Sequence, residues 1–324
     1  MEIITNNNSL DLQVVSRAKT EGNFLEANTK EMDLQTIERD HLVPVFTKDN
    51  EPCISHAQFI ETVERAADDY FNELPSIPAI RVSHEVKGRI PEARHKSAKD
   101  LLPHERTTYY ERCAFMMDIP SIQDEVSGNL MKLSVGGVKS FSQDNLFNYR
   151  SSGQHFQFFI GFKNQVCLNL CVFSDGFSKK IVVNTDDELY NQVMKIIEAY
   201  DGVKHLEQLR RFGEYELSEQ QFAQLIGRAR MYPHLIKEEK EKIPGLELSD
   251  TQINRVVEYY YKDENFARSA DGSIDLWRLF NCFTGANRAS SYIDKFLERA
   301  AGSHSFVSGI ADVLESKSDS WFLN

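Results

Sequence analysis

The spacing of apolar residues divides the chain into a strand-rich middle and a helical second half. From about residue 79 to 185, apolar side chains alternate with polar ones or run together in short stretches. The clearest strands cover 155–162 and 165–173, with Lys163 and Asn164 as a tight turn between them. From about 186 onward the apolar positions recur at three- and four-residue intervals, as on an amphipathic helix. Because strands and helices are segregated along the chain, the predicted fold class is α+β, a mainly antiparallel sheet followed by an all-helical region.

Three serines mark predicted helix starts. Ser55, Ser218 and Ser249 are each followed three residues later by glutamine and then by helically spaced apolar residues, which is the pattern of a capping box. Two further helices are predicted over 274–283 and 292–300, with the glycine-containing stretch 284–288 as a break between them. The glycine pair at 136–137 follows a predicted strand and indicates a bulge or a turn.

These patterns suggest three regions. Residues 1–40 are polar and rich in asparagine, which is typical of a flexible N-terminal arm. Residues 41–185 form the strand-rich α+β region, and residues 186–324 form the helical region.

Composition fits an ordinary globular protein. The chain has 324 residues, of which 41% are hydrophobic and 27% charged. It contains no run of about twenty apolar residues and no basic start followed by an apolar core, so we expect a cytoplasmic protein without a membrane partner. Its five cysteines are scattered and odd in number, which favours free thiols over a disulfide framework.

One segment departs from the acidic character of the chain. The net charge is −12, yet residues 81–99 carry six Lys or Arg and only two acidic residues. Gly88 and Pro91 favour an exposed loop whose cations could bind phosphates, because arginine offers paired donors to phosphate oxygens. With two downstream arginines, the candidate nucleic-acid-binding residues are Arg81, Lys87, Arg89, Arg94, Lys96, Lys99, Arg106 and Arg112. The competing interpretation is a solvated loop whose cations pair with acidic residues from elsewhere.

Aromatic residues crowd the strand region near these cations. Single-stranded nucleic-acid binders use such residues to stack bases, but phenylalanine in a strand more often belongs to the core, and we favour the core here. The residues concerned are Phe141, Phe147, Tyr149, Phe156, Phe158, Phe159 and Phe162.

The sequence gives little indication of catalysis. It lacks the motifs of hydrolases, kinases and dinucleotide enzymes, and no pair of carboxylates stands out as general acid and base. Cys167 and Cys171 fall within a predicted strand, where four residues span about 13 Å and separate the thiols too far to share one ion. We therefore expect no cofactor and no metal, and a buried Cys113 rather than a nucleophilic one.

A set of stretches is distinctive when taken together: 41–50, 87–91, 108–112, 136–139, 159–167, 221–228, 275–280 and 321–324. With these stretches the chain resembles a bacterial family, the domain of unknown function numbered thirty-eight seventy-one, over about residues 40–324. The second half is also distantly similar to the phage/plasmid-like proteins. The resemblance implies carriage on mobile genetic elements and supplies no catalytic residues.

Two functions remain open, with an enzyme of unrecognised type ranked below both. The first is a nucleic-acid-binding accessory protein of a phage, plasmid or conjugative transposon, acting on single- or double-stranded nucleic acid. The alternative is a protein-interaction module of the anti-defence or DNA-mimic type that acts on a host factor. The net charge of −12 suits a mimic of acidic DNA.

Overall fold

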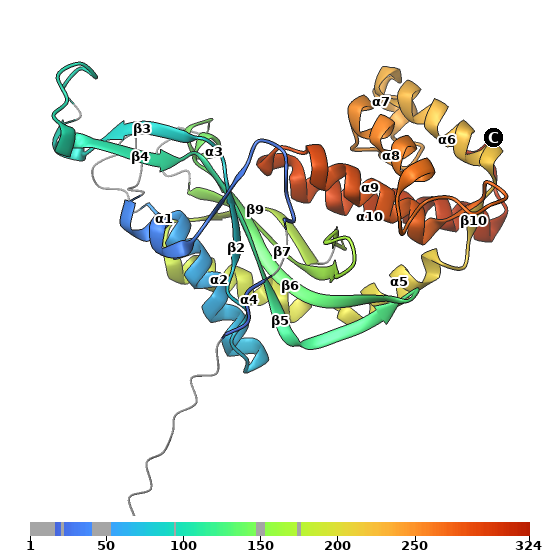
Figure 1. The fold of residues 1–324 in the computed structure, drawn as a ribbon, viewed down its shortest axis with the longest axis horizontal. Helices are drawn as coiled ribbons and strands as arrows, with labels where there is room; N and C mark the ends of the chain where they lie inside the picture. The colour runs from blue at the N-terminus through green and yellow to red at the C-terminus, as the bar shows by residue number, and fades with distance from the viewer. Residues whose placement is uncertain (1–16, 21–22, 41–52, 94, 147–152, 174–175) are drawn as a thin grey trace, which may run out of the picture.

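The computed structural model describes residues 17–20, 23–40, 53–93, 95–146, 153–173 and 176–324 (Figure 1). The strands are β1 (Lys30–Met32), β2 (Ala79–Val82), β3 (Glu85–Arg89), β4 (Arg106–Tyr110), β5 (Arg112–Val126), β6 (Asn129–Ser140), β7 (Gln154–Asn164), β8 (Leu170–Cys171), β9 (Phe177–Val183), β10 (Glu216–Leu217) and β11 (Ile274–Asp275). The α-helices are α1 (Leu34–Asp40), α2 (His56–Phe71), α3 (Phe141–Leu146), α4 (Asp186–Ala199), α5 (Gly202–Phe212), α6 (Glu219–Met231), α7 (Lys237–Lys240), α8 (Asp250–Lys262), α9 (Leu276–Ser290) and α10 (Ile293–Ser316). Short 3₁₀ turns lie at Pro91–Ala93, Pro103–Glu105 and Tyr232–His234.

The predicted α+β class is confirmed. The main sheet has the order β1-β2-β5-β6-β7-β8, with β9 also paired to β7, and every ladder between these strands is antiparallel. After residue 186 the described chain consists of helices and their connections, with the two-residue strands β10 and β11 as its only strands. The sheet curls across the centre of the molecule, with the helices α6–α10 gathered at one end (Figure 1).

Helices cover both faces of the sheet because its strands are apolar on both sides. On one face α2 packs through Phe59, whose ring lies 5.0 Å from that of Phe115 and 4.8 Å from that of Phe156. On the other face, Phe296 near the start of α10 belongs to a second cluster together with Phe159 of β7. Neighbouring residues of β7 therefore serve two cores, as expected for a strand whose side chains alternate between faces.

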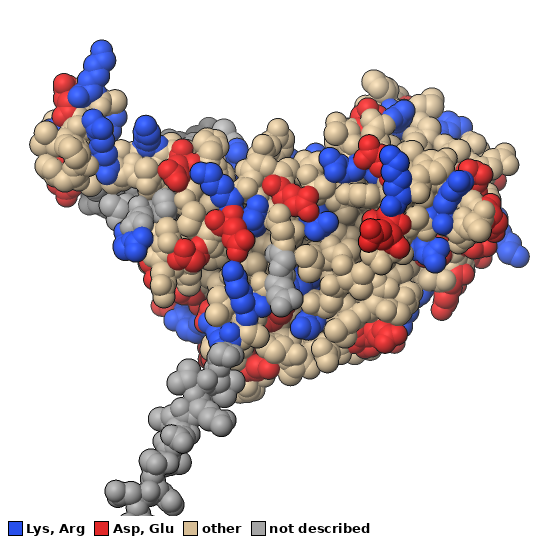
Figure 2. Space-filling model, in the orientation of Figure 1, with Lys and Arg blue, Asp and Glu red and all other residues tan. Residues whose placement is uncertain are grey.

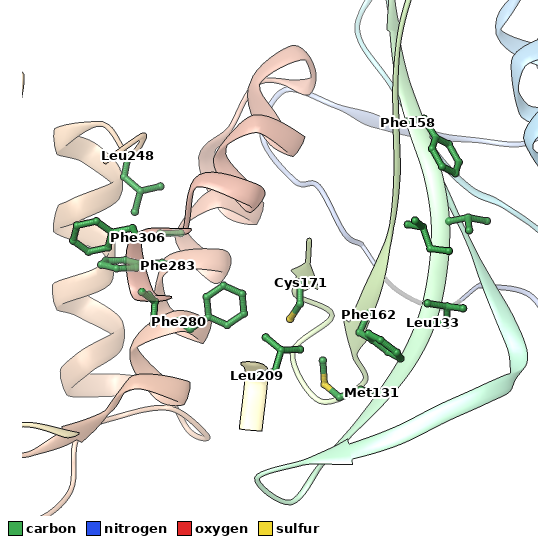
Figure 3. Packing of buried hydrophobic residues seen from close by; sticks show 14 of the residues in the cluster. Met131, Leu133, Phe158, Phe162, Cys171, Leu209, Leu248, Phe280, Phe283 and Phe306 are labelled. Carbon is green, nitrogen blue, oxygen red and sulfur yellow. The ribbon is translucent and has the colours of Figure 1, made fainter. Parts of the chain in front are cut away.

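The larger core is continuous from the sheet into the helical region. Figure 3 shows Leu209 of α5 between Phe162 and Met131 of the sheet and Phe280 of α9. Because one apolar cluster joins the two regions, the sheet and the C-terminal helices form one packed body rather than separately cored units.

Two of the capping boxes are confirmed in full. Ser55 and Ser218 each accept a hydrogen bond from the backbone N–H three residues on, and the glutamine at that position accepts one from the serine N–H. At Ser249 the structure shows the reciprocal half, in which the serine N–H donates to Gln252 Oε1 at 3.0 Å.

Both glycine-based predictions of turns are wrong, because close packing explains these glycines. Gly137 lies inside β6, where an added Cβ would be 2.4 Å from Phe59 Cζ, so glycine lets α2 approach the sheet. Gly285 lies inside α9, where a Cβ would be 3.2 Å from the Tyr259 ring of α8.

The predicted tight turn at Lys163 and Asn164 is also wrong. Both residues end strand β7 and are fully buried, and the chain reverses over 165–169 before the short strand β8. Lys163 Nζ lies 2.6 Å from Asp118 Oδ2, and Ser134 Oγ donates to Asp118 Oδ1 at 2.8 Å. Lys163, a polar residue that the sequence places in a turn, is therefore one half of a buried ion pair. Cys167 accordingly lies in the connection rather than in a strand.

The N-terminal region is more structured than the predicted arm of 1–40. Within the described part, Phe24 and Leu25 are buried in the second core cluster, and β1 and α1 lie before residue 41. Residues 1–16 and 21–22 lie outside the described residues. All five cysteines are free thiols, as predicted.

Candidate anion-binding site on the hairpin

Residues 85–89 of the basic segment form one strand of a β-hairpin, where a loop around 87–91 was predicted. Strands β3 and β4 pair antiparallel and extend from the main sheet as an arm (Figure 1). In this register Arg89 faces Arg106 and Lys87 faces Thr108. Residues that face each other across an antiparallel pair lie on the same side of the ribbon, so Lys87, Arg89 and Arg106 share one face of the arm.

These three cations line a pocket of about 570 Å³ together with Arg39 of α1. The remaining wall residues are Gly88, Ala98, Leu101, Thr107 and Thr108. Among the described residues, the wall therefore carries four positive side chains and no carboxylate. Such a concave site with convergent cations is suited to an anion, and phosphate oxygens accept the paired donors of arginine well.

The facing arginines of the hairpin repel each other. Like charges directly opposite each other on an antiparallel pair are destabilising, and Arg89 stands opposite Arg106. In the part of the chain that the structure describes, neither residue nor Lys87 has an ion-pair partner within 4 Å. Instead, the Arg89 guanidinium donates to the carbonyl oxygen of Lys96, and Arg106 Nη2 donates to that of Leu101 at 3.3 Å. Both arginines are thereby held in place while their charge stays uncompensated.

Other predicted residues have structural partners. Arg81 of β2 is only 9% exposed, and its Nε and Nη2 donate to Thr29 Oγ1 at 3.0 and 2.8 Å. Burial lowers the pKa of its guanidinium. Arg112 is half-buried between Glu111 and Asp294, at 3.6 and 3.9 Å. These two arginines connect elements of the fold and are not on the hairpin pocket.

The connection between the two hairpin strands contains the remaining candidates. Lys96 forms an ion pair with Glu105, which also accepts the Leu102 N–H at 2.8 Å. The hydrogen bond from Lys96 is the main cause that lowers the pKa of the Glu105 carboxyl. Lys99 is exposed outside the pocket wall, and Arg94 lies outside the described residues. The competing interpretation, pairing with acidic residues, thus holds for Lys96 and Arg112.

Arg39 is the member of the pocket that the sequence prediction missed. It lies in a short helix far from the basic segment in sequence, and only the packing of α1 beside the hairpin brings it to the pocket. No local motif marks it, because the basic cluster is assembled by tertiary structure.

The five described members of the aromatic group belong to the core, as favoured from the sequence. Phe156, Phe158, Phe159 and Phe162 are each at most 2% exposed. Phe141 is also buried, and the Lys139 ammonium lies 3.9 Å from the Phe156 ring centroid. Phe147 and Tyr149 lie outside the described residues. These buried phenylalanines therefore offer no platform on which a base could stack.

No catalytic constellation stands out in the described ranges. They hold no group of three or more His, Cys, Asp or Glu side chains placed to bind a metal ion. Cys113 is buried, and burial raises the pKa of its thiol, which disfavours the nucleophilic thiolate. Across the same described residues, the helices are too short or too polar to cross a membrane.

Charge is distributed unevenly but without one continuous basic groove on the face shown in Figure 2. Lys and Arg side chains occur on the protruding arm, and both signs alternate over the rest of that face. The site is therefore a local pocket rather than an extended cationic surface.

A family model described as "Domain of unknown function, B. Theta Gene description (DUF3871)" matches residues 5–323. The chain belongs to the DUF3871 family. No curated protein matches it. No solved structure matches it either. For this DUF3871 chain, the hairpin pocket is the feature from which a function can be argued.

Proposed function

We propose that this protein binds nucleic acid by gripping the sugar-phosphate backbone with the hairpin arm. The observation that carries the proposal is the convergence of Lys87, Arg89 and Arg106, with Arg39, on one pocket whose described wall has no carboxylate. Backbone phosphates would supply the negative charge that the facing arginines lack.

The geometry favours a duplex over a single strand. Single-strand binders combine a basic groove with exposed aromatic rings, whereas the phenylalanines of β7 are buried. A two-stranded β-ribbon, in contrast, fits the major groove of duplex DNA, and its cations can contact the flanking phosphates.

The acidic body does not prevent such contact. The net charge of −12 repels a polyanion at long range, but at about 0.1 M salt charges more than about 10 Å apart are largely screened. Because the hairpin projects from the sheet (Figure 1), a duplex could contact the arm without lying along the body.

A charge-matched pair of variants tests the proposal. The triple variant Lys87→Gln, Arg89→Gln, Arg106→Gln should lower the affinity for a short DNA duplex strongly. The control Lys195→Gln, Lys237→Gln, Lys262→Gln changes three exposed lysines on other helices by the same total charge and should have little effect. Since Arg89 and Arg106 each also bond a carbonyl oxygen of the hairpin connection, the single variant Lys87→Gln separates lost charge from a disturbed loop.

The outcomes discriminate between the functions left open by the sequence. If the parent protein binds neither duplex nor single-stranded nucleic acid at low salt, the proposal fails and the protein-interaction alternative leads. Equal losses in the hairpin and control variants would show a nonspecific charge effect and would also refute it. The association with mobile elements stays a prediction.

A further inference from the structure

A second pocket, of about 600 Å³, opens where α2 and α4 end over the sheet. Its floor is apolar and includes Leu133, Ile160 and Phe162 from β6 and β7, and Ile197 from α4, all at most 4% exposed. A pocket of this volume with a buried apolar floor is of the size that holds small organic ligands.

The mouth of the pocket is also partly apolar. Val203, at the start of α5, is 68% exposed, and Tyr70, in the last turn of α2, is 41% exposed. Large apolar side chains that stay this exposed at the rim of an apolar cavity lose contact with water when a ligand enters, which favours binding of an apolar body.

The charge at this pocket has one sign. Its lining contains Asp124, Glu198 and Asp201 and, among the described residues, no Lys, Arg or His. Asp124 is neutralised by Arg210, whose Nη2 lies 2.6 Å from its Oδ1. Glu198 and Asp201 have no ion-pair partner in the described structure.

The helix ends add to this negative character. The C-termini of α2 and α4 both lie at the pocket, and neither helix has a basic residue in its last turn. Helix C-termini carry partial negative charge and favour cations. The N-terminus of α5 has the opposite sign, but Asp201 caps it by accepting the Lys204 N–H at 2.9 Å.

We infer that this pocket binds a small organic cation: a molecule with an apolar body that fills the floor and an ammonium group that meets Glu198 and Asp201 at the rim. The apolar floor selects the body, and the two carboxylates without an ion-pair partner in the described structure select the charge. This site is distinct from the hairpin pocket in residues and in the sign of its charge, so the inference is independent of the proposed function.

Fluorescence titration of the full chain with two dansyl probes tests the inference. Dansylcadaverine carries a primary ammonium group at neutral pH, and dansylglycine carries a carboxylate on the same fluorophore. We expect the cation to bind about tenfold more tightly, since two partly exposed carboxylates each contribute a few-fold.

Three variants locate the binding. Glu198→Gln with Asp201→Asn should remove the preference for the cation, and asparagine keeps the helix cap of α5. Glu207→Gln, at an exposed residue on α5 outside the pocket lining, is the control for loss of a nearby carboxylate and should change nothing. Val203→Ser should weaken both probes by a similar factor, because it removes apolar contact without changing charge.

A cation that binds no better than the anion would overturn the inference. The same is true if Glu198→Gln with Asp201→Asn affects dansylcadaverine no more than Glu207→Gln does. Failure here leaves the nucleic-acid proposal untouched, because that proposal depends on a different pocket.

Discussion

Two buried histidines should make folding stability fall steeply below about pH 6.5. His205 of α5 and His304 of α10 lie with ring centroids 5.4 Å apart, and His304 also contacts the rings of Phe173, Phe212 and Phe280. Both side chains are at most 2% exposed, and among the described residues the Nε2 atom of each has no hydrogen-bond partner. Burial lowers the pKa of His304 to about 4 and that of His205 well below its ordinary 6.5, with His304 as a smaller cause for His205.

The sign and size follow from proton linkage. Between the folded and unfolded pKa values the unfolded chain binds a proton that the folded chain does not, so the free energy of unfolding falls as pH falls. Each histidine contributes about 1.4 kcal/mol per pH unit in this window. His304 alone should cost about 3 kcal/mol between pH 6.5 and its folded pKa of about 4. His205 should add to this loss in the same direction, because burial also lowers its pKa.

Other groups that face the pair do not obscure the result. The Tyr200 hydroxyl lies 2.7 Å from His205 Nδ1, and burial raises its pKa, so it does not titrate in this range. Cys171 is a raised-pKa thiol, and Lys204 lies with its Nζ 5.2 Å from the Phe173 ring centroid. Carboxylates elsewhere also titrate below pH 6, so the measurement compares two proteins rather than two pH values.

Urea unfolding of the parent and of His304→Phe at several values between pH 4.5 and 8 provides the measurement. Phenylalanine fits an aromatic environment and cannot be protonated. As pH falls below 6.5, the free energy of unfolding of the variant should therefore decrease by about 1.4 kcal/mol per pH unit less than that of the parent. Parallel curves for the two proteins would refute the reasoning, because they would mean that His304 is protonated in the folded state as readily as in the unfolded chain.

Two other predictions concern stability. Gly137→Ala should lower the free energy of unfolding by about 1–3 kcal/mol, because the added Cβ would meet Phe59. Gly227→Ala in α6 should raise it by up to about 1 kcal/mol, because no atom lies within 4 Å of the added Cβ. Similar urea midpoints for the two variants would contradict this. Lys163→Met should lower the free energy of unfolding by about 3–5 kcal/mol, because it leaves the Asp118 carboxylate buried and unpaired. Arg210→Ala should lower it by at most about 1 kcal/mol, because both side chains of that ion pair are 43% exposed. Equal losses in these two variants would show that burial does not determine how much the Lys163–Asp118 ion pair contributes to stability.

Periodicity predicted the fold class and several helix starts because both depend on local sequence. Ser55 and Ser218 cap their helices through bonds to residues three positions away, so the pattern contains the whole interaction. The predictions at Gly137 and Gly285 were wrong for the opposite reason. The role of these glycines depends on Phe59 and Tyr259, which approach from other elements and leave no mark in the neighbouring sequence.

The candidate site was predicted in part. Lys87, Arg89 and Arg106 were identified by charge, but the hairpin that aligns them was not, since its strands are polar and joined by a long connection. Charge alone also selected Arg81 and Arg112, which the fold uses to connect elements. Arg39 could be found only from the structure, because it reaches the pocket through tertiary packing.

The salt dependence of duplex binding tests the central claim most directly. For the parent protein, the logarithm of the binding constant should fall linearly with the logarithm of salt concentration, with a slope of about 0.9 per phosphate contact. Lys87→Gln, Arg89→Gln, Arg106→Gln should make this slope shallower by about 2–3 units, while the variant of Lys195, Lys237 and Lys262 should keep the parent slope. An unchanged slope in the hairpin variant, or no duplex binding by the parent at low salt, would contradict the claim that the hairpin pocket grips phosphates.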